Sequence, residues 1–186
     1  MYDIETLLAA IKNGFQPKYL FFWGHRPRKD GRIGKQCFSQ WWSSPFTIAE
    51  VVYPTAEHYM MAEKARLFGD SLTGKKILSA PHPQVAKKLG RAVKGFTEAV
   101  WVQHRFEIVV RGNEAKFQQN DALKQFLLNT QDQILVEASP VDQVWGIGLA
   151  ADAPEALNPE QWRGLNLLGF ALMKVRAELQ LGKSGG

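Results

Sequence analysis

The stretch that decides the fold is YPTAEHYMMAEKARLF, Tyr53–Phe68. Pro54 ends any extended segment before it, and Thr55 is a favourable N-cap residue. The residues that follow are mostly strong helix formers and include no glycine or proline. The stretch therefore predicts a helix over residues 56–68, with the rest of the chain packed around it.

This helix places an acid and an amine on one side. Glu57 lies in the first turn, where the free N–H groups and the helix dipole favour a carboxylate, and Lys64 follows two turns later, about 10 Å along the axis. Two interpretations are open. Both charges are also ordinary choices for a solvated helix. A carboxylate on an otherwise apolar helix needs a partner, however, and the polar-tipped neighbours His58 and Tyr59 favour a functional site.

The composition fits one globular domain. The chain has 186 residues, of which 45% are hydrophobic and 22% charged. We expect a single domain over residues 1–181 and a flexible tail over residues 182–186, which are rich in glycine. No apolar run approaches the roughly 20 residues that span a bilayer, and no signal-peptide pattern is present, so the prediction is a cytoplasmic protein without a membrane partner.

Cysteine and histidine give no indication of a metal site or another cofactor. Cys37 is the single cysteine, which excludes an internal disulfide and a cysteine-type zinc site. We interpret it as a small buried residue rather than a nucleophile. The four histidines do not have the spacing of metal ligands.

The net charge of +5 and the sequence pI of about 9.4 indicate anionic partners. The positive residues concentrate in a loop, His25–Arg32, and near a helix end, Lys87–Lys94. Solvated surfaces explain such clusters as well as phosphate or nucleic-acid contacts do. No motif with a known nucleic-acid docking geometry accompanies them.

The remaining patterns predict a mainly α (α+β) fold with a small antiparallel β element near the N-terminus. Apolar spacing and an Asp3 cap predict a first helix that ends at Gly14. Strand candidates at 19–23, 37–42 and 46–52 would form the sheet ahead of the Glu57 helix. Further helices are expected at 71–78, 83–89, 97–117 with a possible break at Gly112, 121–129 and from about Asn166, with a short extended piece at 134–137.

Residues 139–164 form a long segment rich in Pro, Asp, Ala and Gly. Loops of this length in compact domains are either functional or disordered. A disordered linker would not be expected to carry Trp145 and Trp162. We therefore expect an ordered loop that contributes to a site.

Several separated motifs occur in an order that resembles one family, over about Tyr19 to Leu179. They are Phe21–His25, Cys37–Trp41, Tyr53–Tyr59 with Lys64, Leu89–Arg91, Trp101, Asp142 with Trp145–Gly148, and Gly164–Gly169. The chain is similar to the YbiA-like, or NADAR, family. The resemblance implies a multihelical domain and an N-glycosidase, a hydrolase of N-glycosyl bonds. The implied substrates are ribosylated bases carrying phosphate, either ADP-ribosylated guanine in nucleic acid such as DNA or the phosphoribosylamino-pyrimidine intermediates of riboflavin biosynthesis.

The resemblance implies catalytic positions at Glu57, Lys64, Trp101 and Asp142. Cleavage of a C1′–N bond builds positive charge on the ribose, which a carboxylate of Glu57 or Asp142 would stabilise while steering water. In a second route, Lys64 with a pKa lowered by burial attacks C1′ and forms a Schiff base. Both routes are open. The tryptophan would stack on the base or the ribose, although a core role is its default.

The resemblance also implies binding residues near these positions. They are aromatic, polar or glycine residues. Arg91 could bind phosphate bidentately or only end its helix, and Asn166 could favour an anion or only cap its helix. The chain has Gln40 and Trp41 where shorter members have Asn and Phe, and it has the basic loop Arg26–Arg32 that they lack, so the choice of substrate is open. The full set is Phe22, Ser39, His58, Tyr59, Arg91, Trp145, Gly146, Gly148 and Asn166.

A second class of function is compatible with the same residues. A non-catalytic module that binds ADP-ribose-like nucleotides or nucleic acid would use the same pocket but release no product. The sequence does not indicate an oligomeric state.

Overall fold

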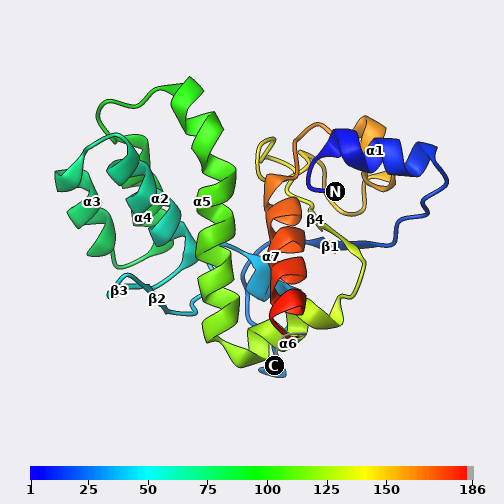
Figure 1. Cartoon of the computed structure of the whole chain (residues 1–186), viewed down its shortest axis with the longest axis horizontal. Coiled ribbons are helices and arrows are strands. Elements are labelled where there is room, and N and C mark those ends of the chain that lie inside the picture. The colour runs from blue at the N-terminus through cyan, green and yellow to red at the C-terminus, as the bar shows by residue number, and fades with distance from the viewer. Residues whose placement is uncertain (184–186) are drawn as a thin grey trace. The chain divides into compact units, whose positions relative to one another are not determined.

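A computed structural model describes residues 1–183, which form two compact units (Figure 1). The middle unit is Gln40–Asp121, and the terminal unit combines Met1–Ser39 with the chain from Ala122 onward. The expectation of one domain over residues 1–181 stays a prediction. The fold class is confirmed, because helices dominate and the strands form two small sheets.

The middle unit is organised around the predicted helix. Its elements are β2 (Phe46–Ile48), β3 (Val51–Tyr53), α2 (Ala56–Leu67), α3 (Ser71–Leu78), α4 (Pro83–Arg91) and α5 (Glu98–Gln119). Figure 1 shows these four helices side by side, and α2 contacts each of the other three. Its buried residues lie on all sides rather than on one stripe, as expected for a helix enclosed by neighbours.

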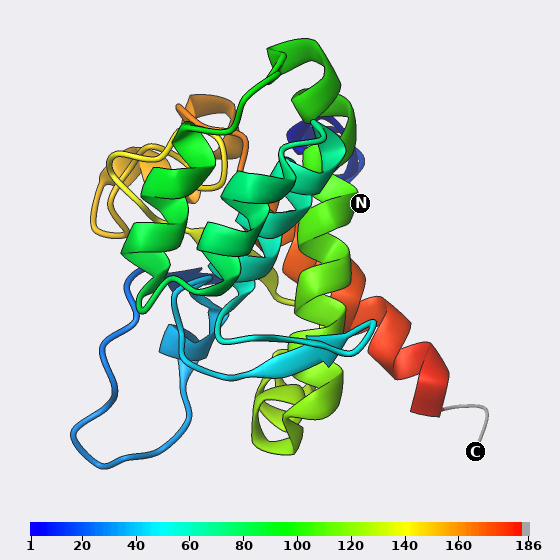
Figure 2. The same ribbon diagram turned by 90° about the vertical axis from the view of Figure 1, so that its left-hand side faces the viewer.

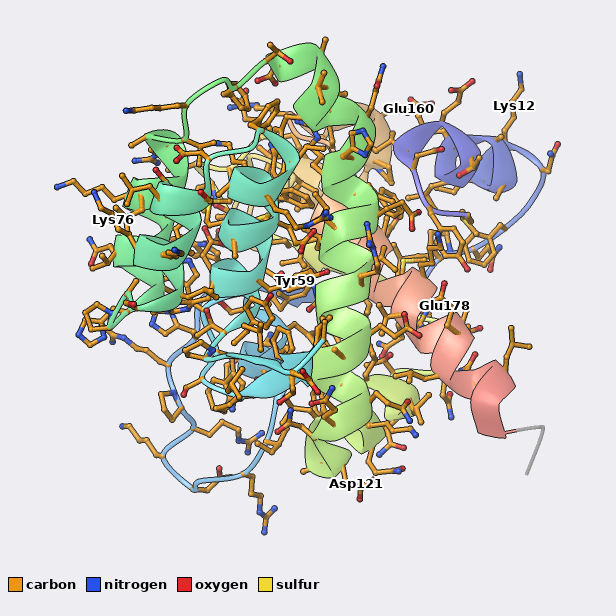
Figure 3. All side chains as sticks on the ribbon, turned by 60° about the vertical axis from the view of Figure 1, so that its left-hand side comes forward. Lys12, Tyr59, Lys76, Asp121, Glu160 and Glu178 are labelled. Atoms are coloured by element: carbon orange, nitrogen blue, oxygen red, sulfur yellow. The ribbon has the colours of Figure 1, made fainter. Side chains whose placement is uncertain are left out.

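Two glycines let the neighbouring helices approach α2 closely. A Cβ added at Gly90 of α4 would overlap the Met61 side chain, and one added at Gly112 of α5 would lie 2.5 Å from Tyr59 Cδ1. Tyr59 is labelled in Figure 3, where it lies between α2 and α5. The predicted break at Gly112 is wrong, because α5 continues unbroken and the space of the missing side chain is filled by the tyrosine ring.

The antiparallel element ahead of α2 is confirmed as a hairpin. Phe46 pairs with Tyr53, and the two-residue turn consists of Ala49 and Glu50 at φ 49° and 66°. Two successive positive φ values match the twist of a tight hairpin. The single strand expected over 46–52 is therefore two short strands.

The terminal unit contains α1 (Ile4–Lys12), β1 (Tyr19–Phe22), α6 (Asp121–Asn129), β4 (Ile134–Glu137), α7 (Leu167–Lys183) and three short 3₁₀ helices. These 3₁₀ helices are η1 (Lys35–Phe38), η2 (Pro154–Leu157) and η3 (Pro159–Gln161). β1 pairs in parallel with β4, with Tyr19 opposite Ile134, and α7 packs on β4. Burial at Ile134, Leu135 and Val136 fits a parallel strand covered on both faces.

Three predictions are corrected in the terminal unit. The strand at 19–23 does not join an antiparallel sheet, because its partner lies more than 100 residues later, and residues 37–42 form no strand because η1 occupies their first part. The last helix begins at Leu167 and includes Gly182 and Lys183, which were expected in the tail; residues 184–186 of that tail lie outside the described residues. Within residues 1–183, no helix has both the length and the apolar character that membrane crossing requires.

Candidate active site

The N-terminus of α2 is fixed by a closed set of hydrogen bonds. Thr55 Oγ1 accepts from the His58 backbone N–H at 3.2 Å and lies 2.7 Å from His58 Nδ1, while His58 Nε2 lies 2.9 Å from the Ala80 carbonyl oxygen. A carbonyl only accepts, so Nε2 carries the proton and the threonine hydroxyl donates to Nδ1. Burial lowers the pKa of His58, which fits this neutral tautomer. Both ring nitrogens therefore bond within the protein.

Glu57 is held beside this cap. Its backbone N–H donates to the Gln40 carbonyl oxygen at 3.0 Å, and its side chain is only 4% exposed. A carboxylate so deeply buried in the first helical turn is stabilised by the dipole, and it interacts electrostatically with Lys64. The predicted acid and amine thus influence each other along α2.

The amine of Lys64 lies between two aromatic rings. Its Nζ is 4.5 Å from the centroid of Phe96 and 5.5 Å from that of Trp101. Burial lowers the pKa of Lys64, and nearby Arg91 lowers it further, while Glu98 and Glu57 oppose the shift. A half-buried amine of lowered pKa is a better nucleophile near neutral pH than an exposed lysine. The arrangement can add a nitrogen to an electrophilic carbon beside an aromatic surface.

The segment that carries Phe96 is shaped by a glycine and anchored by an acid. Gly95 has φ +78°, and a Cβ there would lie 3.3 Å from the Phe68 carbonyl oxygen. Asp70 Oδ2 accepts from the Lys94 N–H at 2.9 Å, and this bond together with those from Thr73 lowers the pKa of Asp70 to about 2. The sequence analysis missed Phe96. The glycine just before it was the available signal, but it does not identify a partner for the ring.

Arg91 and Trp101 lie at the edges of this group. Arg91 is exposed as the last residue of α4 and is close enough to affect the pKa of Lys64. Trp101 is 8% exposed, whereas Phe96 is 39% exposed. Phe96 is therefore the more exposed of the two rings beside the amine, and Trp101 is the buried one.

Tyr59 lies in the core of the middle unit. Its ring packs edge-on against Tyr53 at 5.0 Å between centroids and against Phe46 at 6.1 Å. Burial raises the pKa of Tyr59 to about 12. These contacts, like those of His58, support α2 from within, so we do not include either residue in the proposed ligand contacts.

In the terminal unit, Asp142 organises its own loop. Its Oδ1 accepts from the backbone N–H groups of Val144 at 2.9 Å and Trp145 at 2.8 Å, and its own N–H donates to Ser139 Oγ at 3.1 Å. Over residues 1–183 no hydrogen bond reaches Oδ2. The loop thus orients the carboxylate and leaves one oxygen for another partner.

Asn166 bonds to the edge of β4 that faces away from β1. Its Oδ1 accepts from the Glu137 N–H at 2.9 Å, and its Nδ2 donates to the Leu135 carbonyl oxygen at 3.0 Å. Its φ of 52° is a conformation that asparagine tolerates. The side chain is fully buried and replaces a missing neighbouring strand.

The two predicted glycines face protein atoms. A Cβ at Gly146 would lie 2.8 Å from the Glu137 carbonyl oxygen, and Gly148 adopts φ +67° beside Arg163. Trp145 between them is half-buried. The loop 139–164 is ordered as expected, because η2, η3 and a bond from Trp162 Nε1 to the Ala156 carbonyl oxygen at 2.8 Å fix it.

The remaining predicted residues of the terminal unit lie near η1. Phe22 is buried and packs edge-on against Phe38, with 5.3 Å between ring centroids, and Ser39 is half-buried at the end of η1. The unit also has a cavity of about 690 Å³ between α1 and the η2–η3 segment, lined in part by Phe15, Tyr19 and Glu160. None of the predicted site residues lines it.

The chain is similar to several known proteins. The chain is 43% identical over 170 residues to an N-glycosidase of Acanthamoeba polyphaga mimivirus, covering 88% of this chain and 97% of that protein. It is 30% identical over 146 residues to N-glycosidase YbiA of Escherichia coli, covering 78% and 82% of the two chains. The NMR structure of E. coli YbiA superposes with a TM-score of 0.73 at 26% identity, covering 92% and 90%.

A third relative is a much longer plant protein. The riboflavin biosynthesis protein PYRR of Zea mays, a chloroplast protein, is 34% identical over 135 residues, which are 68% of this chain and 20% of that one. The family model described as the NADAR domain matches residues 21–180. The chain therefore belongs to the NADAR family and is a YbiA-like member of it.

Proposed function

We propose that this N-glycosidase cleaves the bond between ribose C1′ and a base nitrogen in a phosphorylated substrate, with Lys64 as the nucleophile and Glu57 as its acid–base partner. The hydrolase class follows from the N-glycosidases among its relatives. The observation that carries the assignment of residues is the Lys64 amine between Phe96 and Trp101, on the helix that also buries Glu57.

The lysine route needs no oxidant or reductant. The neutral amine attacks C1′ and the C1′–N bond to the base breaks, while the Glu57 carboxylate takes a proton from Nζ and passes it to the leaving base. Opening of the ribose ring then gives a Schiff base, with the second Nζ proton passing to the ribose O4′. Water adds to C1′, the bond to Nζ breaks, and the free sugar and the amine are restored, so that one water is consumed per turnover.

Other residues have supporting roles in this proposal. Arg91 is exposed close to the amine, which suits contact with the phosphate of the substrate. Phe96 is the more exposed ring beside the amine, which suits a contact with the base. Asp142 is a separate proposal from the family resemblance: its Oδ2 would bond a ribose hydroxyl or steer water.

The substrate class is a phosphorylated ribosylated base, with two candidates. ADP-ribosylated guanine in nucleic acid is implied by the motifs and suits the basic charge of the chain. A phosphoribosylamino-pyrimidine is supported by the similarity to the maize riboflavin biosynthesis protein. We further propose that turnover needs no metal, so that chelators leave the rate unchanged. Cytoplasmic location stays a prediction.

Incubation of the purified chain with each substrate tests the proposal, with released base and sugar followed by mass spectrometry. We expect release from at least one substrate, and reduction with borohydride during turnover should leave the sugar attached to Lys64. Glu57→Gln should lower kcat by about 10²–10⁴-fold while ligand binding and the thermal midpoint stay near those of the parent.

The outcomes separate the alternatives. Turnover without any trapped adduct would replace the lysine route by direct hydrolysis. Full activity in Glu57→Gln would remove that residue from the mechanism. Saturable binding of both substrates without product would favour the non-catalytic binding module, which the enzymatic relatives make the weaker reading.

A further inference from the structure

Most of the net charge of the protein lies in one loop. The segment between β1 and η1, residues 23–34, contains no helix or strand, and Figure 2 shows it (blue) as a long open excursion. Together with Lys35, it contains five of the 23 lysines and arginines and one of the 18 acidic residues. The segment therefore accounts for four of the five net positive charges, and the rest of the chain is almost neutral.

The loop is held in shape by its single acid. Arg28 Nε and Nη2 donate to the two carboxylate oxygens of Asp30 at 3.0 and 2.7 Å, and the Arg32 N–H donates to the same carboxylate at 3.1 Å. A turn closes with the Gly31 N–H donating to the Arg28 carbonyl oxygen at 3.0 Å. One cation thus neutralises the acid, and the others remain available to a partner.

The remaining cations follow an exposed aromatic residue along the chain. Arg26, Lys29 and Arg32 are exposed, and Trp23 is 60% exposed, an unusual state for a side chain that ordinarily gains by burial. Two residues separate Trp23 from Arg26, so their Cα atoms lie at most about 10 Å apart. A flat apolar side chain followed by several exposed cations fits a partner that alternates flat bases with phosphates.

We propose that Trp23 and the basic loop Arg26–Arg32 bind single-stranded nucleic acid, with the indole stacking on a base and the cations contacting phosphates. Free bases of a single strand can stack on an indole, whereas paired bases within a duplex cannot. The consequence for catalysis rests on the proposed function, because the loop would favour a base within a strand over a free nucleotide. The contact itself does not require catalysis.

Fluorescence anisotropy with the inactive full chain Glu57→Gln and a labelled, unmodified oligothymidylate tests the contact. Arg26→Gln with Lys29→Gln should weaken binding and reduce the slope of log affinity against log salt by about 1.4, since each phosphate contact on a single strand contributes about 0.7. The matched control is Lys75→Gln with Lys76→Gln on α3, which removes the same charge from exposed positions; Lys76 is labelled in Figure 3. This control should change neither quantity.

The contribution of Trp23 can be distinguished from that of the cations by its salt dependence. Trp23→Ala should weaken binding about 5- to 100-fold with an unchanged salt slope, and Trp23→Phe should keep most of the affinity. Equal losses in the two double variants, or no loss in Trp23→Ala, would overturn the proposal. So would binding to anionic lipid vesicles with none to oligothymidylate or oligouridylate. A preference between those two polymers would identify the source of the strand.

The proposed nucleic-acid contact and the proposed catalytic function can be contradicted independently of each other. Loop variants that bind the strand weakly but release base from a small nucleotide substrate at the parental rate support the contact and leave the chemistry intact. Parental strand affinity in the loop variants overturns the contact whether or not any base is released.

Discussion

In the terminal unit, the polar side chains of the predicted site bond to their own backbone, whereas in the middle unit the Lys64 amine lies between aromatic rings. Asn166 uses both ends of its amide on β4, and Asp142 uses one oxygen on its loop. Asn166 and Asp142 thus support the fold of their unit, whereas the surroundings of Lys64 lower the pKa of a reactive group. Replacing a motif residue should therefore mainly reduce activity in the middle unit and mainly reduce stability in the terminal unit.

The largest effect is expected at Lys64. Lys64→Met should lower kcat/KM by at least about a thousandfold, because it removes the nucleophile while filling similar space. Since burial lowers the pKa of this amine, loss of the charge should change the free energy of unfolding by less than about 1 kcal/mol. Urea unfolding and steady-state kinetics measure both quantities. Lys75→Met on the exposed face of α3 is the control and should change neither kcat/KM nor the free energy of unfolding. A large loss of stability in Lys64→Met would contradict the difference proposed between the two units.

The converse is expected at Asn166. Asn166→Ala leaves the Glu137 N–H and the Leu135 carbonyl oxygen buried without their partner, at a cost of about 2–5 kcal/mol in the free energy of unfolding. Activity per folded molecule should stay close to that of the parent. Asn158→Ala, an exposed cap of η3, is the matched control and should cost about 1 kcal/mol. If Asn166→Ala is as stable as the parent but inactive, Asn166 acts on the ligand and the comparison fails.

The smallest effect is a shift in pH dependence. Attack requires neutral Lys64, so kcat/KM should rise with pH through the lowered pKa of this amine and level off above it. The Glu98 carboxylate raises that pKa, so Glu98→Gln should move the rising limb to lower pH. A pH–rate profile measures the shift, and Glu160→Gln in the terminal unit should leave the limb in place. If the rising part of the kcat/KM profile keeps its pH or moves to higher pH in Glu98→Gln, a group other than Lys64 controls the pH dependence.

The sequence predicted what depends on neighbouring residues. The cap at Thr55, the helix that follows it and the position of Glu57 and Lys64 all arise within one helix, whose spacing is fixed by 3.6 residues per turn. The partner of β1 could not be predicted in this way, because β4 lies more than 100 residues later and an apolar run does not specify what it pairs with. Phe96 was missed for the same reason, since its ring reaches Lys64 only through the turn at Gly95. Asn166 was assigned to a helix end, but its side chain bonds to a strand.

The bonds of Asn166 also bear on how this protein avoids self-association. A strand with an open edge is a template on which a second molecule can add its own strand. One amide side chain, with the Ile147 N–H that donates to the Glu137 carbonyl oxygen at 2.9 Å, satisfies the outer edge of β4. Residues of the 164–169 motif thus keep that edge closed to a second chain, which protects the protein from aggregation through β4 at high concentration.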